Sequence, residues 1–355
     1  MSNFIVTNKI EVELTTVIKS LAVDKVFVLV DENTAEHCLP IVMPELQDAI
    51  VIKIKAGDET KSIDTAVEIW NVLVDKGATR ASLLINLGGG VITDLGGFAA
   101  ATYMRGIKFV NIPTTLLAMV DASSGGKTGF DYLGVKNAIG TFTPPMATFI
   151  DPIFLRTLPA EELLSGFAEM LKNALRASEE EWIKLLQLAQ EELPHEQFIE
   201  ALSNTGALQA SIAIKENVVT QDPQESGLRK VLNFGHTIGH AIESTILEQT
   251  SLPQSSHGYC VLWGMVTEVY LSVVKLGCPR EVLQQLTQVM LQYYGRPQCN
   301  CKQREQLIQR MYQDKKNSAH QAPNFTLLCA VGEPAINQYI SEEEIDEALE
   351  YLFSL

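Results

Sequence analysis

The sequence predicts an α/β protein in two parts: a parallel sheet covered by helices on both faces, then a mainly helical region. Three observations support this fold class. Short apolar runs alternate with helix-spaced segments in the first half, and strands become rare after about residue 150. The chain has 355 residues, 46% of them hydrophobic, which is enough for two domains with real cores.

Four apolar runs in the first half predict buried strands, at residues 25–31, 50–55, 82–87 and 108–113. Segments with helical spacing separate them. In residues 62–76, for example, Ile63, Val67, Trp70 and Val74 recur three or four positions apart. Apolar strands that alternate with helices are typical of a parallel sheet between two helical layers.

The second part is predicted to be mainly helical. Helical spacing appears in residues 161–176, 178–192, 198–220 and 278–290, and the clearest strand is 325–331. Ser341 and Glu344 form a capping-box pattern that opens a last amphipathic helix to Leu355. We therefore expect domains at 1–155 and 156–355, with the active site in the cleft between them.

Composition excludes several classes of protein. The 27 basic and 43 acidic residues give a net charge of −16, which disfavours nucleic acid as a partner. Lys9, Glu11 and Glu13 interrupt the stretch where a signal peptide would be apolar, and no run approaches a membrane span. The six cysteines contain no CxxC pair, unlike a disulfide scaffold. These features predict a cytoplasmic protein that binds neither nucleic acid nor membrane.

Two glycine-rich segments are candidate phosphate sites. Residues 82–97 read as a strand, a glycine turn and a helix, but Thr93 stands where a G-x-G-x-x-G pattern needs its third glycine. A dinucleotide site and an ordinary βα turn are equally compatible with that spacing. In Ser124-Gly-Gly-Lys-Thr128, Asp121 replaces the first glycine of a P-loop, so Lys127 would bind phosphate without a nucleotide cradle.

Three of the six histidines cluster in the second part. His236 and His240 lie one helical turn apart, and His257 follows. Position 237 is not Glu, so the pair is not the HExxH motif of metalloproteases. A zinc site with a carboxylate ligand is favoured over core or capping histidines, and composition leaves three carboxylates open: Glu169, Glu225 and Glu243.

Many motifs in order resemble those of the 3-dehydroquinate synthase family. They are Gly57–Ser62, GGGVITDLGGFAA, Arg105-Gly106, IPTTLLAMVDASSGGKTG, GVKNAIGTFTPP, FLRTLP, GFAEMLK, LNFGHTIGHAIE, His257-Gly258 and DKKN. The resemblance implies a Rossmann-like NAD-binding domain followed by a mainly helical metal-binding domain, the dehydroquinate synthase-like fold. It also implies that the chain is a lyase of the shikimate pathway, which leads to chorismate and the aromatic amino acids.

The implied reaction converts 3-deoxy-D-arabino-heptulosonate 7-phosphate into 3-dehydroquinate and phosphate. It proceeds by NAD-dependent oxidation, phosphate elimination, reduction, ring opening and intramolecular aldol closure. The implied cofactors are NAD and Zn²⁺, with Co²⁺ as an alternative ion. The resemblance also implies a homodimer, in which Arg105 reaches the phosphate site of the neighbouring subunit.

The resemblance assigns site residues position by position. The metal ligands fall on Glu169, His236 and His257. Catalytic roles fall on Lys127, Lys172, Glu225, Arg229, Asn233 and His240, with Glu225 as a proton acceptor and His240 as an acid–base group. Cofactor contacts fall on Asp31, Asp58, Glu59, Lys61, Gly89, Gly90, Val91, Asp94, Thr114, Thr115, Asp121, Lys127, Lys136, Phe154, Leu155, Arg156 and Thr157. Substrate contacts fall on Arg105, Asn137, Lys172, Lys215, Arg229, Asn233, His240, Lys315 and Lys316.

One departure from the family pattern is Tyr259, where a Glu usually follows the His-Gly pair. That Glu is not a ligand in the family, so we expect the metal site to be retained. Two alternative functions share the expected fold. One is another sugar-phosphate cyclase, of the 2-deoxy-scyllo-inosose or amino-dehydroquinate synthase type. The other is a metal-dependent polyol or alcohol dehydrogenase.

The charge is not evenly spread along the sequence. Residues 105–160 carry five basic residues (Arg105, Lys108, Lys127, Lys136 and Arg156) and three acidic ones (Asp121, Asp131 and Asp151), a local charge of +2. Much of the acidic excess lies at 179–181 and 342–350. This pattern predicts an acidic exterior around a basic cleft for a substrate with phosphate and carboxylate groups.

Overall fold

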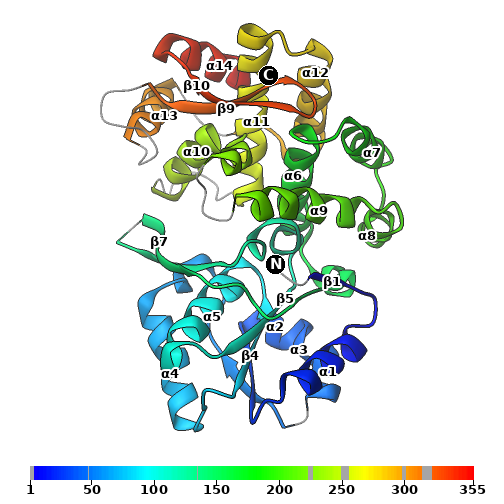
Figure 1. Cartoon of the computed structure of the whole chain (residues 1–355). Coiled ribbons are helices and arrows are strands. Elements are labelled where there is room, and N and C mark those ends of the chain that lie inside the picture. Colours follow the sequence, from blue (N-terminus) through cyan, green and yellow to red (C-terminus); the bar gives the residue numbers. More distant parts are fainter. Residues whose placement is uncertain are drawn as a thin grey trace. The chain divides into compact units, whose positions relative to one another are not determined.

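The computed structural model describes residues 4–46, 48–133, 135–222, 227–248, 256–297, 301–313 and 322–355. The chain divides into two compact units, Met1–Pro159 and Ala160–Leu355. The expected boundary between residues 155 and 156 lies a few residues before this division. Figure 1 shows the helices and strands of each unit.

The first unit contains a parallel sheet of six strands in the order β1-β8-β5-β4-β2-β3. The strands are β1 (Phe4–Val6), β2 (Val26–Val30), β3 (Ile50–Lys53), β4 (Leu83–Gly88), β5 (Lys108–Pro113) and β8 (Thr148–Ile150). Strands β2 to β5 are the four apolar runs that the sequence predicts. The parallel-sheet fold class is therefore confirmed for this half of the chain.

Helices cover the sheet on both faces (Figure 1). They are α1 (Ile10–Leu21), α2 (Glu32–His37), α3 (Leu39–Val42), α4 (Ile63–Asp75) and α5 (Gly90–Thr102). On one face, Ile69 of α4 and Leu95 of α5 belong to the same buried cluster as Phe27 and Leu84 of the sheet. On the other side lie α1 and α3. Burial of these apolar faces is the main force that holds such layers together.

A buried polar pair interrupts the apolar interior of the sheet. Asn86 of β4 and Asn111 of β5 are register partners, and the Asn86 Nδ2 donates to the Asn111 Oδ1 at 2.9 Å. Gly96 of α5 lies directly against this amide: a Cβ at position 96 would be only 2.0 Å from the Asn86 Oδ1. The close approach of α5 to the sheet thus depends on a glycine facing an asparagine.

An antiparallel hairpin, which the sequence patterns did not predict, extends from the first unit. It consists of β6 (Lys127–Tyr132) and β7 (Val135–Phe142). Gly129 and Gly140 are register partners, and a Cβ on either would lie within 2.4 Å of the opposite strand's backbone. The hairpin carries Lys127, Lys136 and Asn137, three of the expected site residues.

The second unit is mainly helical, as the sequence predicts. Its helices are α6 (Ala160–Leu175), α7 (Glu179–Gln190), α8 (His195–Asn204), α9 (Ala207–Gln221), α10 (His236–Glu248), α11 (His257–Leu276), α12 (Arg280–Val289), α13 (Cys301–Gln313) and α14 (Glu342–Ser354). A hairpin of β9 (Asn324–Ala330) and β10 (Glu333–Tyr339) accompanies them. The predicted capping box of Ser341 and Glu344 is present at the start of α14.

The single helix expected at 198–220 is instead two helices, α8 and α9. Gly206 ends the first of them with a φ of +72°, a left-handed conformation in which a helix does not continue. The apolar spacing persists across this break, which is why periodicity alone suggests one helix. That expectation was wrong in this detail.

Helix α11 is the central element of the second unit, where it contacts α6, α10, α12, α14 and β9. By length and composition it is the one helix among the described residues that would suffice to cross a membrane, but 67% of that window is buried. Such burial is typical of a core helix. Helices α10 and α11 approach closely at glycines: a Cβ on Gly264 would lie 2.1 Å from the Gly235 carbonyl oxygen and 2.7 Å from the Gly239 nitrogen.

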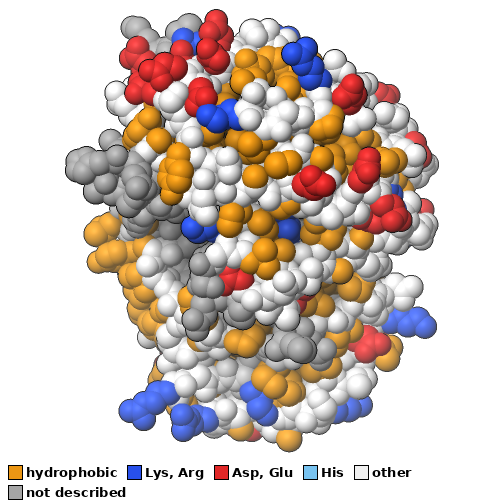
Figure 2. All heavy atoms as spheres, turned by 45° about the horizontal axis from the view of Figure 1, so that its top comes forward, with side chains coloured by type: hydrophobic (Ala, Val, Ile, Leu, Met, Phe, Trp, Pro, Cys, Tyr) orange, Lys and Arg blue, Asp and Glu red, His pale blue; other side chains and the backbone are white. Residues whose placement is uncertain are grey.

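Acidic side chains are exposed on α7 and α14, two helices that contain none of the family motifs. Glu179 and Glu180 on α7, and Glu342, Glu343, Glu347 and Glu350 on α14, are exposed. Figure 2 shows acidic side chains gathered at the end of the second unit that contains α14. Like charges spread over exposed helices keep a protein soluble without shaping a site.

Candidate functional site

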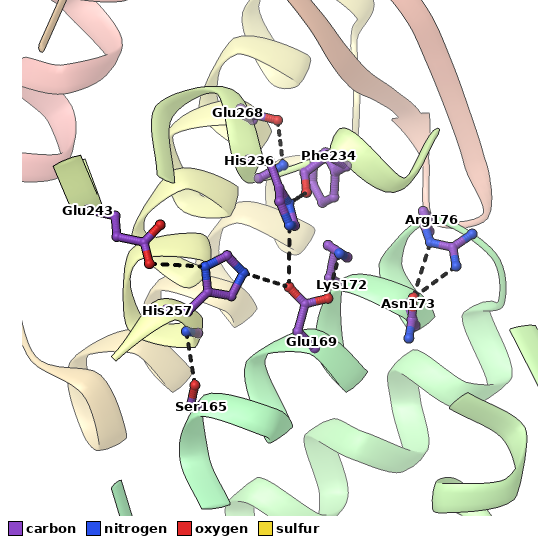
Figure 3. A network of polar contacts seen from close by, with 12 residues as sticks. Ser165, Glu169, Lys172, Asn173, Arg176, Phe234, His236, Glu243, His257 and Glu268 are labelled. Atoms are coloured by element: carbon purple, nitrogen blue, oxygen red, sulfur yellow. Dashed lines mark hydrogen bonds and ion pairs between the residues drawn. The ribbon is translucent and has the colours of Figure 1, made fainter. Parts of the chain in front are cut away.

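Three side chains from three helices of the second unit meet at one point. Glu169 comes from α6, His236 begins α10 and His257 begins α11 (Figure 3). The Glu169 Oε1 lies 3.6 Å from the His236 Nε2 and 3.8 Å from the His257 Nε2. Glu169 is fully buried, whereas the side chain of His257 is 29% exposed. The cluster therefore has a closed side and an open side.

Hydrogen bonds behind the two histidines aim their Nε2 atoms at Glu169. The His236 Nδ1 is 3.1 Å from the Phe234 carbonyl oxygen, a contact that only an N–H can make, so Nε2 carries the lone pair. The His257 Nδ1 is 3.4 Å from the Glu243 Oε1. Metal-ligating histidines are commonly held in this way by a carbonyl or a carboxylate.

The pKa values of the two histidines move in opposite directions. Burial, followed by the charge of Lys172, lowers the pKa of His236 well below its usual value, so this imidazole is neutral. Burial also opposes the charged form of His257, but the hydrogen bond and charge of Glu243 outweigh it and raise the pKa. A neutral His236 is the form that binds metal.

These side chains fit a metal ion. A lone pair on His236 Nε2 and a carboxylate oxygen of Glu169 face each other with no proton between them, and among the described residues no hydrogen bond reaches that oxygen. Two ligands held about 2.0–2.1 Å from one tetrahedral zinc ion lie roughly 3.4 Å apart. The observed 3.6 and 3.8 Å are close to that separation.

His240 offers an alternative ligand set. One ring nitrogen from each of His236, His240 and His257 lies within 4.8 Å of the others. The rings of His236 and His240 meet edge to face with centroids 5.0 Å apart. Both sets share His236 and His257 and differ in the third ligand, which is Glu169 in one and His240 in the other.

Several cationic side chains are buried in the second unit, and one of them contacts the cluster. The Lys172 Nζ forms an ion pair with the Glu169 Oε2 at 2.5 Å, and its side chain is 1% exposed. Lys215 on α9 and Arg229 on the turn Leu228–Asn233 are also buried. Asp222 fixes the start of that turn, since its Oδ2 accepts hydrogen bonds from the Gly227 and Arg229 backbone N–H groups, both at 2.9 Å. Asn233 ends the turn and is partly buried.

In the first unit, several expected cofactor residues lie at the carboxyl edge of the sheet. Asp31 directly follows β2 and caps α2, and Gly89 to Val91 follow β4 and begin α5. Thr114 and Thr115 follow β5, where the Thr114 N–H donates to the Gly88 carbonyl. Chain connections leave β2 and β4 toward opposite edges of the sheet, so this is a topological switch point, where open α/β sheets bind ligands.

Lys61 links two further predicted residues in the first unit, Asp94 and Asn137. Its Nζ lies 2.6 Å from both the Asp94 Oδ2 and the Asn137 Oδ1. Asn137 has a left-handed φ of +50°, and its N–H donates to the Asp131 Oδ1 at 2.6 Å. Asp131 was not among the expected site residues, and no sequence pattern distinguished it.

The remaining predicted residues of the first unit have varied surroundings. Asp58 and Glu59 form a short turn before Lys61, and Asp121 lies in the π-helical segment Ala118–Ala122. Lys127 and Lys136 are exposed on the hairpin, and Arg105 is exposed with a φ of +67°. In the turn Pro152–Thr157, Phe154 and Leu155 are buried, whereas Arg156 and Thr157 are exposed.

Three predicted residues, Glu225, Lys315 and Lys316, lie outside the described part of the chain. Of the three carboxylates left open by composition, Glu169 faces both Nε2 atoms, whereas Glu243 contacts the other nitrogen of His257. Sequence reasoning did not find the buried carboxylate of Glu268, which accepts the Gly235 N–H at 2.6 Å.

Comparison with known proteins identifies the family of the chain. The model of the 3-dehydroquinate synthase N-terminal region matches residues 51–165, and that of the C-terminal region matches residues 166–317. The chain belongs to the 3-dehydroquinate synthase family. The 3-dehydroquinate synthase of Parabacteroides distasonis is 43% identical over 349 residues, which cover 98% of this chain and 96% of that protein.

Solved structures of related cyclases share the fold of this family member. A 2-epi-5-epi-valiolone synthase from Streptomyces hygroscopicus, solved with NAD⁺ and Zn²⁺ bound, is 25% identical and superposes with a TM-score of 0.87, covering 100% of this chain and 97% of that one. A 2-deoxy-scyllo-inosose synthase, solved with carbaglucose-6-phosphate, NAD⁺ and Co²⁺, has a TM-score of 0.84 at 21% identity, covering 99% and 96%. The expected dehydroquinate synthase-like fold is confirmed.

Proposed function

We propose that this chain is a 3-dehydroquinate synthase, a lyase that converts 3-deoxy-D-arabino-heptulosonate 7-phosphate into 3-dehydroquinate and phosphate. The observation that carries the proposal is the convergence of Glu169, His236 and His257 in a chain whose relatives bear that name. We further propose that it works in the cytoplasm as a homodimer, with the exposed Arg105 contacting the phosphate site of the second copy.

The metal site would be formed by Glu169, His236 and His257, with one position left for substrate. A Zn²⁺ or Co²⁺ ion bound there supplies a Lewis acid that polarises a substrate hydroxyl. The chain's own residues prepare the site: Phe234 and Glu243 orient the two imidazoles, and Lys172 balances part of the charge of Glu169.

The cofactor site would lie at the carboxyl edge of the sheet in the first unit. NAD bound there supplies a hydride acceptor that later returns the hydride, so it is regenerated in each turnover. Gly89 allows close backbone approach at the start of α5, and the free N–H groups of that helix end suit a pyrophosphate. Asp31 is placed after the neighbouring strand, where an acidic residue binds ribose hydroxyls in similar folds.

Substrate binding and proton transfer would use the remaining predicted residues. Lys172, Lys215 and Arg229 are buried cations, a suitable match for the carboxylate and phosphate of the substrate. His240, one helical turn from His236, would accept the proton of the hydroxyl that is oxidised. In the same proposal Lys127, Asn137, Asn233, Lys315 and Lys316 bind substrate and Glu225 accepts a proton.

Phosphate release from the heptulosonate, with NAD and Zn²⁺ present, tests the proposed activity. We expect one phosphate per 3-dehydroquinate formed, with no net accumulation of NADH. If the heptulosonate releases no phosphate but another sugar phosphate does, the chain is a cyclase of different specificity.

The second candidate function is a metal-dependent polyol dehydrogenase. Its supporting observation is the shared fold, since a probable glycerol dehydrogenase from Sinorhizobium meliloti superposes with a TM-score of 0.64 over 99% of this chain and 96% of that one. This function predicts that NADH accumulates in proportion to polyol. Stoichiometric NADH without phosphate release would replace the main proposal with this one.

A further inference from the structure

Glu268 is a buried carboxylate that the proposed reaction does not use. It lies on α11, where its side chain has no exposed surface. Its Oε2 accepts a hydrogen bond from the backbone N–H of Gly235 at 2.6 Å (Figure 3). Gly235 directly precedes His236, so the carboxylate contacts the backbone at the position where a proposed metal ligand begins.

A single peptide group lies between Glu268 and the ring of His236. It is the amide that joins Phe234 to Gly235: its N–H donates to Glu268 and its C=O accepts the Nδ1–H of His236. The N–H and C=O belong to one conjugated, planar unit. A negative charge at the N–H end therefore polarises the C=O end and makes that oxygen a stronger acceptor.

We propose that Glu268 is a positioning residue for metal binding, which acts on His236 through the Phe234–Gly235 peptide. Its charge holds His236 as the Nδ1–H tautomer and makes the Nε2 lone pair a better metal ligand. Carboxylates that contact a ligating histidine directly have this effect, and Glu243 has such a contact with His257. The inference rests on the proposed function, because it concerns the same metal site.

The charge of Glu268 matters beyond its ability to accept a hydrogen bond. Burying a carboxylate is costly, and a neutral side chain would also accept the Gly235 N–H. Glu169, Glu243 and Glu268 are three buried carboxylates of this network, and the Lys172 Nζ pairs with Glu169. A negative charge on Glu268 therefore adds to an environment that favours a bound cation.

The test compares Zn²⁺ affinity in Glu268→Gln and in a matched control, Glu248→Gln. The first substitution keeps an oxygen that accepts the Gly235 N–H but removes the charge. The control removes one carboxylate from the same helix as His236, where Glu248 is exposed and paired with Arg310. Competition with a chromophoric chelator gives each dissociation constant.

We expect Glu268→Gln to bind Zn²⁺ about 10–100-fold more weakly than wild type, the usual cost of losing a partner behind a metal ligand. Glu248→Gln should bind as wild type does. A Glu268→Gln variant with wild-type affinity would overturn the inference while leaving the proposed function intact. A wild-type protein that binds neither Zn²⁺ nor Co²⁺ would refute both.

A second measurement needs no variant, and so does not depend on whether Glu268→Gln folds. In the metal-free wild-type protein with ¹⁵N-labelled histidine, NMR distinguishes the two ring tautomers of His236. The inference requires a proton on Nδ1 and none on Nε2. Observation of the Nε2–H tautomer would refute it.

Discussion

At the scale of single residues, Lys172 has contacts that matter in two ways. Its ammonium pairs with the Glu169 Oε2 at 2.5 Å, which leaves Oε1 directed at the two histidines. Its charge also contributes to lowering the pKa of His236. One buried lysine thus orients a carboxylate and adds to the effect of burial, the main cause of the lowered His236 pKa, and both actions favour binding of a cation by the cluster.

His240→Asn distinguishes the two possible ligand sets. If Glu169 completes the site, the variant keeps its bound metal, and its kcat falls by about 10²–10⁴-fold because a proton-transfer group is lost. Metal analysis and steady-state phosphate release check both expectations, and the exposed His37 provides a control as His37→Asn. Loss of the metal from His240→Asn would instead assign His240 as the third ligand.

At this scale, the sequence predicts local relations between residues but not contacts that depend on tertiary packing. The spacing of His236 and His240 is local, so it indicates one helix face without any knowledge of the fold. The facing carboxylate is not local: Glu169 reaches the histidines only because α6 packs against α11. The contacts of Glu243, Glu268 and Asp131 also depend on tertiary packing and side-chain direction, which no spacing rule encodes.

At the scale of elements, the crossing of α10 and α11 sets the distance between His236 and His257. Gly264 lies at this crossing, facing the backbone of Gly235 and Gly239. Since backbone atoms cannot move aside as a flexible side chain can, any added carbon must separate the helices. The metal site therefore depends on a glycine that contacts no ligand.

Gly264→Ala should weaken both the fold and the metal site. We expect a loss of about 1–3 kcal/mol in the free energy of unfolding, the usual cost of overpacking, together with weaker Zn²⁺ binding. Gly277→Ala, at the end of the same helix, is the control, because its Cβ would meet nothing within 4 Å and only its φ of +72° is strained. Denaturant unfolding measures the stability of each variant, and chelator competition measures its Zn²⁺ affinity. Equal Zn²⁺ affinity in Gly264→Ala and Gly277→Ala would contradict the claim that the α10–α11 crossing sets the metal site.

The elements differ in how far the sequence predicts them. Strands β2 to β5 and helices α4, α6 and α7 follow from period and composition, because the strands are short apolar runs and the helices have apolar residues three or four positions apart. The break at Gly206 and the β6–β7 hairpin do not. The hairpin strands carry mixed polar and glycine residues, and they pair through backbone contacts at Gly129 and Gly140 that have no apolar signature.

At the scale of the whole molecule, metal binding should stabilise the folded chain. The ion would relieve the repulsion among the buried carboxylates and bind only weakly to the unfolded chain. A free Zn²⁺ concentration 1,000 times the dissociation constant adds about 4 kcal/mol to stability.

We therefore expect the melting temperature to rise when Zn²⁺ is added to chelator-treated protein, with a much smaller rise for Glu169→Gln. Differential scanning calorimetry of the full chain measures both. The same rise in wild type and Glu169→Gln would argue against Glu169 as a ligand.

The sheet of the first unit joins a buried amide pair to the place where the cofactor would bind. Asn86 and Asn111 lie two residues before the ends of β4 and β5. The two strands end at the register partners Gly88 and Pro113. If either strand slipped by one residue, an amide would face an aliphatic side chain and lose its partner, so the pair resists slippage. These asparagines therefore determine where along the sheet axis the glycine turn and the Thr114–Thr115 segment emerge. Two side chains in the sheet interior, outside the dinucleotide site, would thus set the geometry of that site.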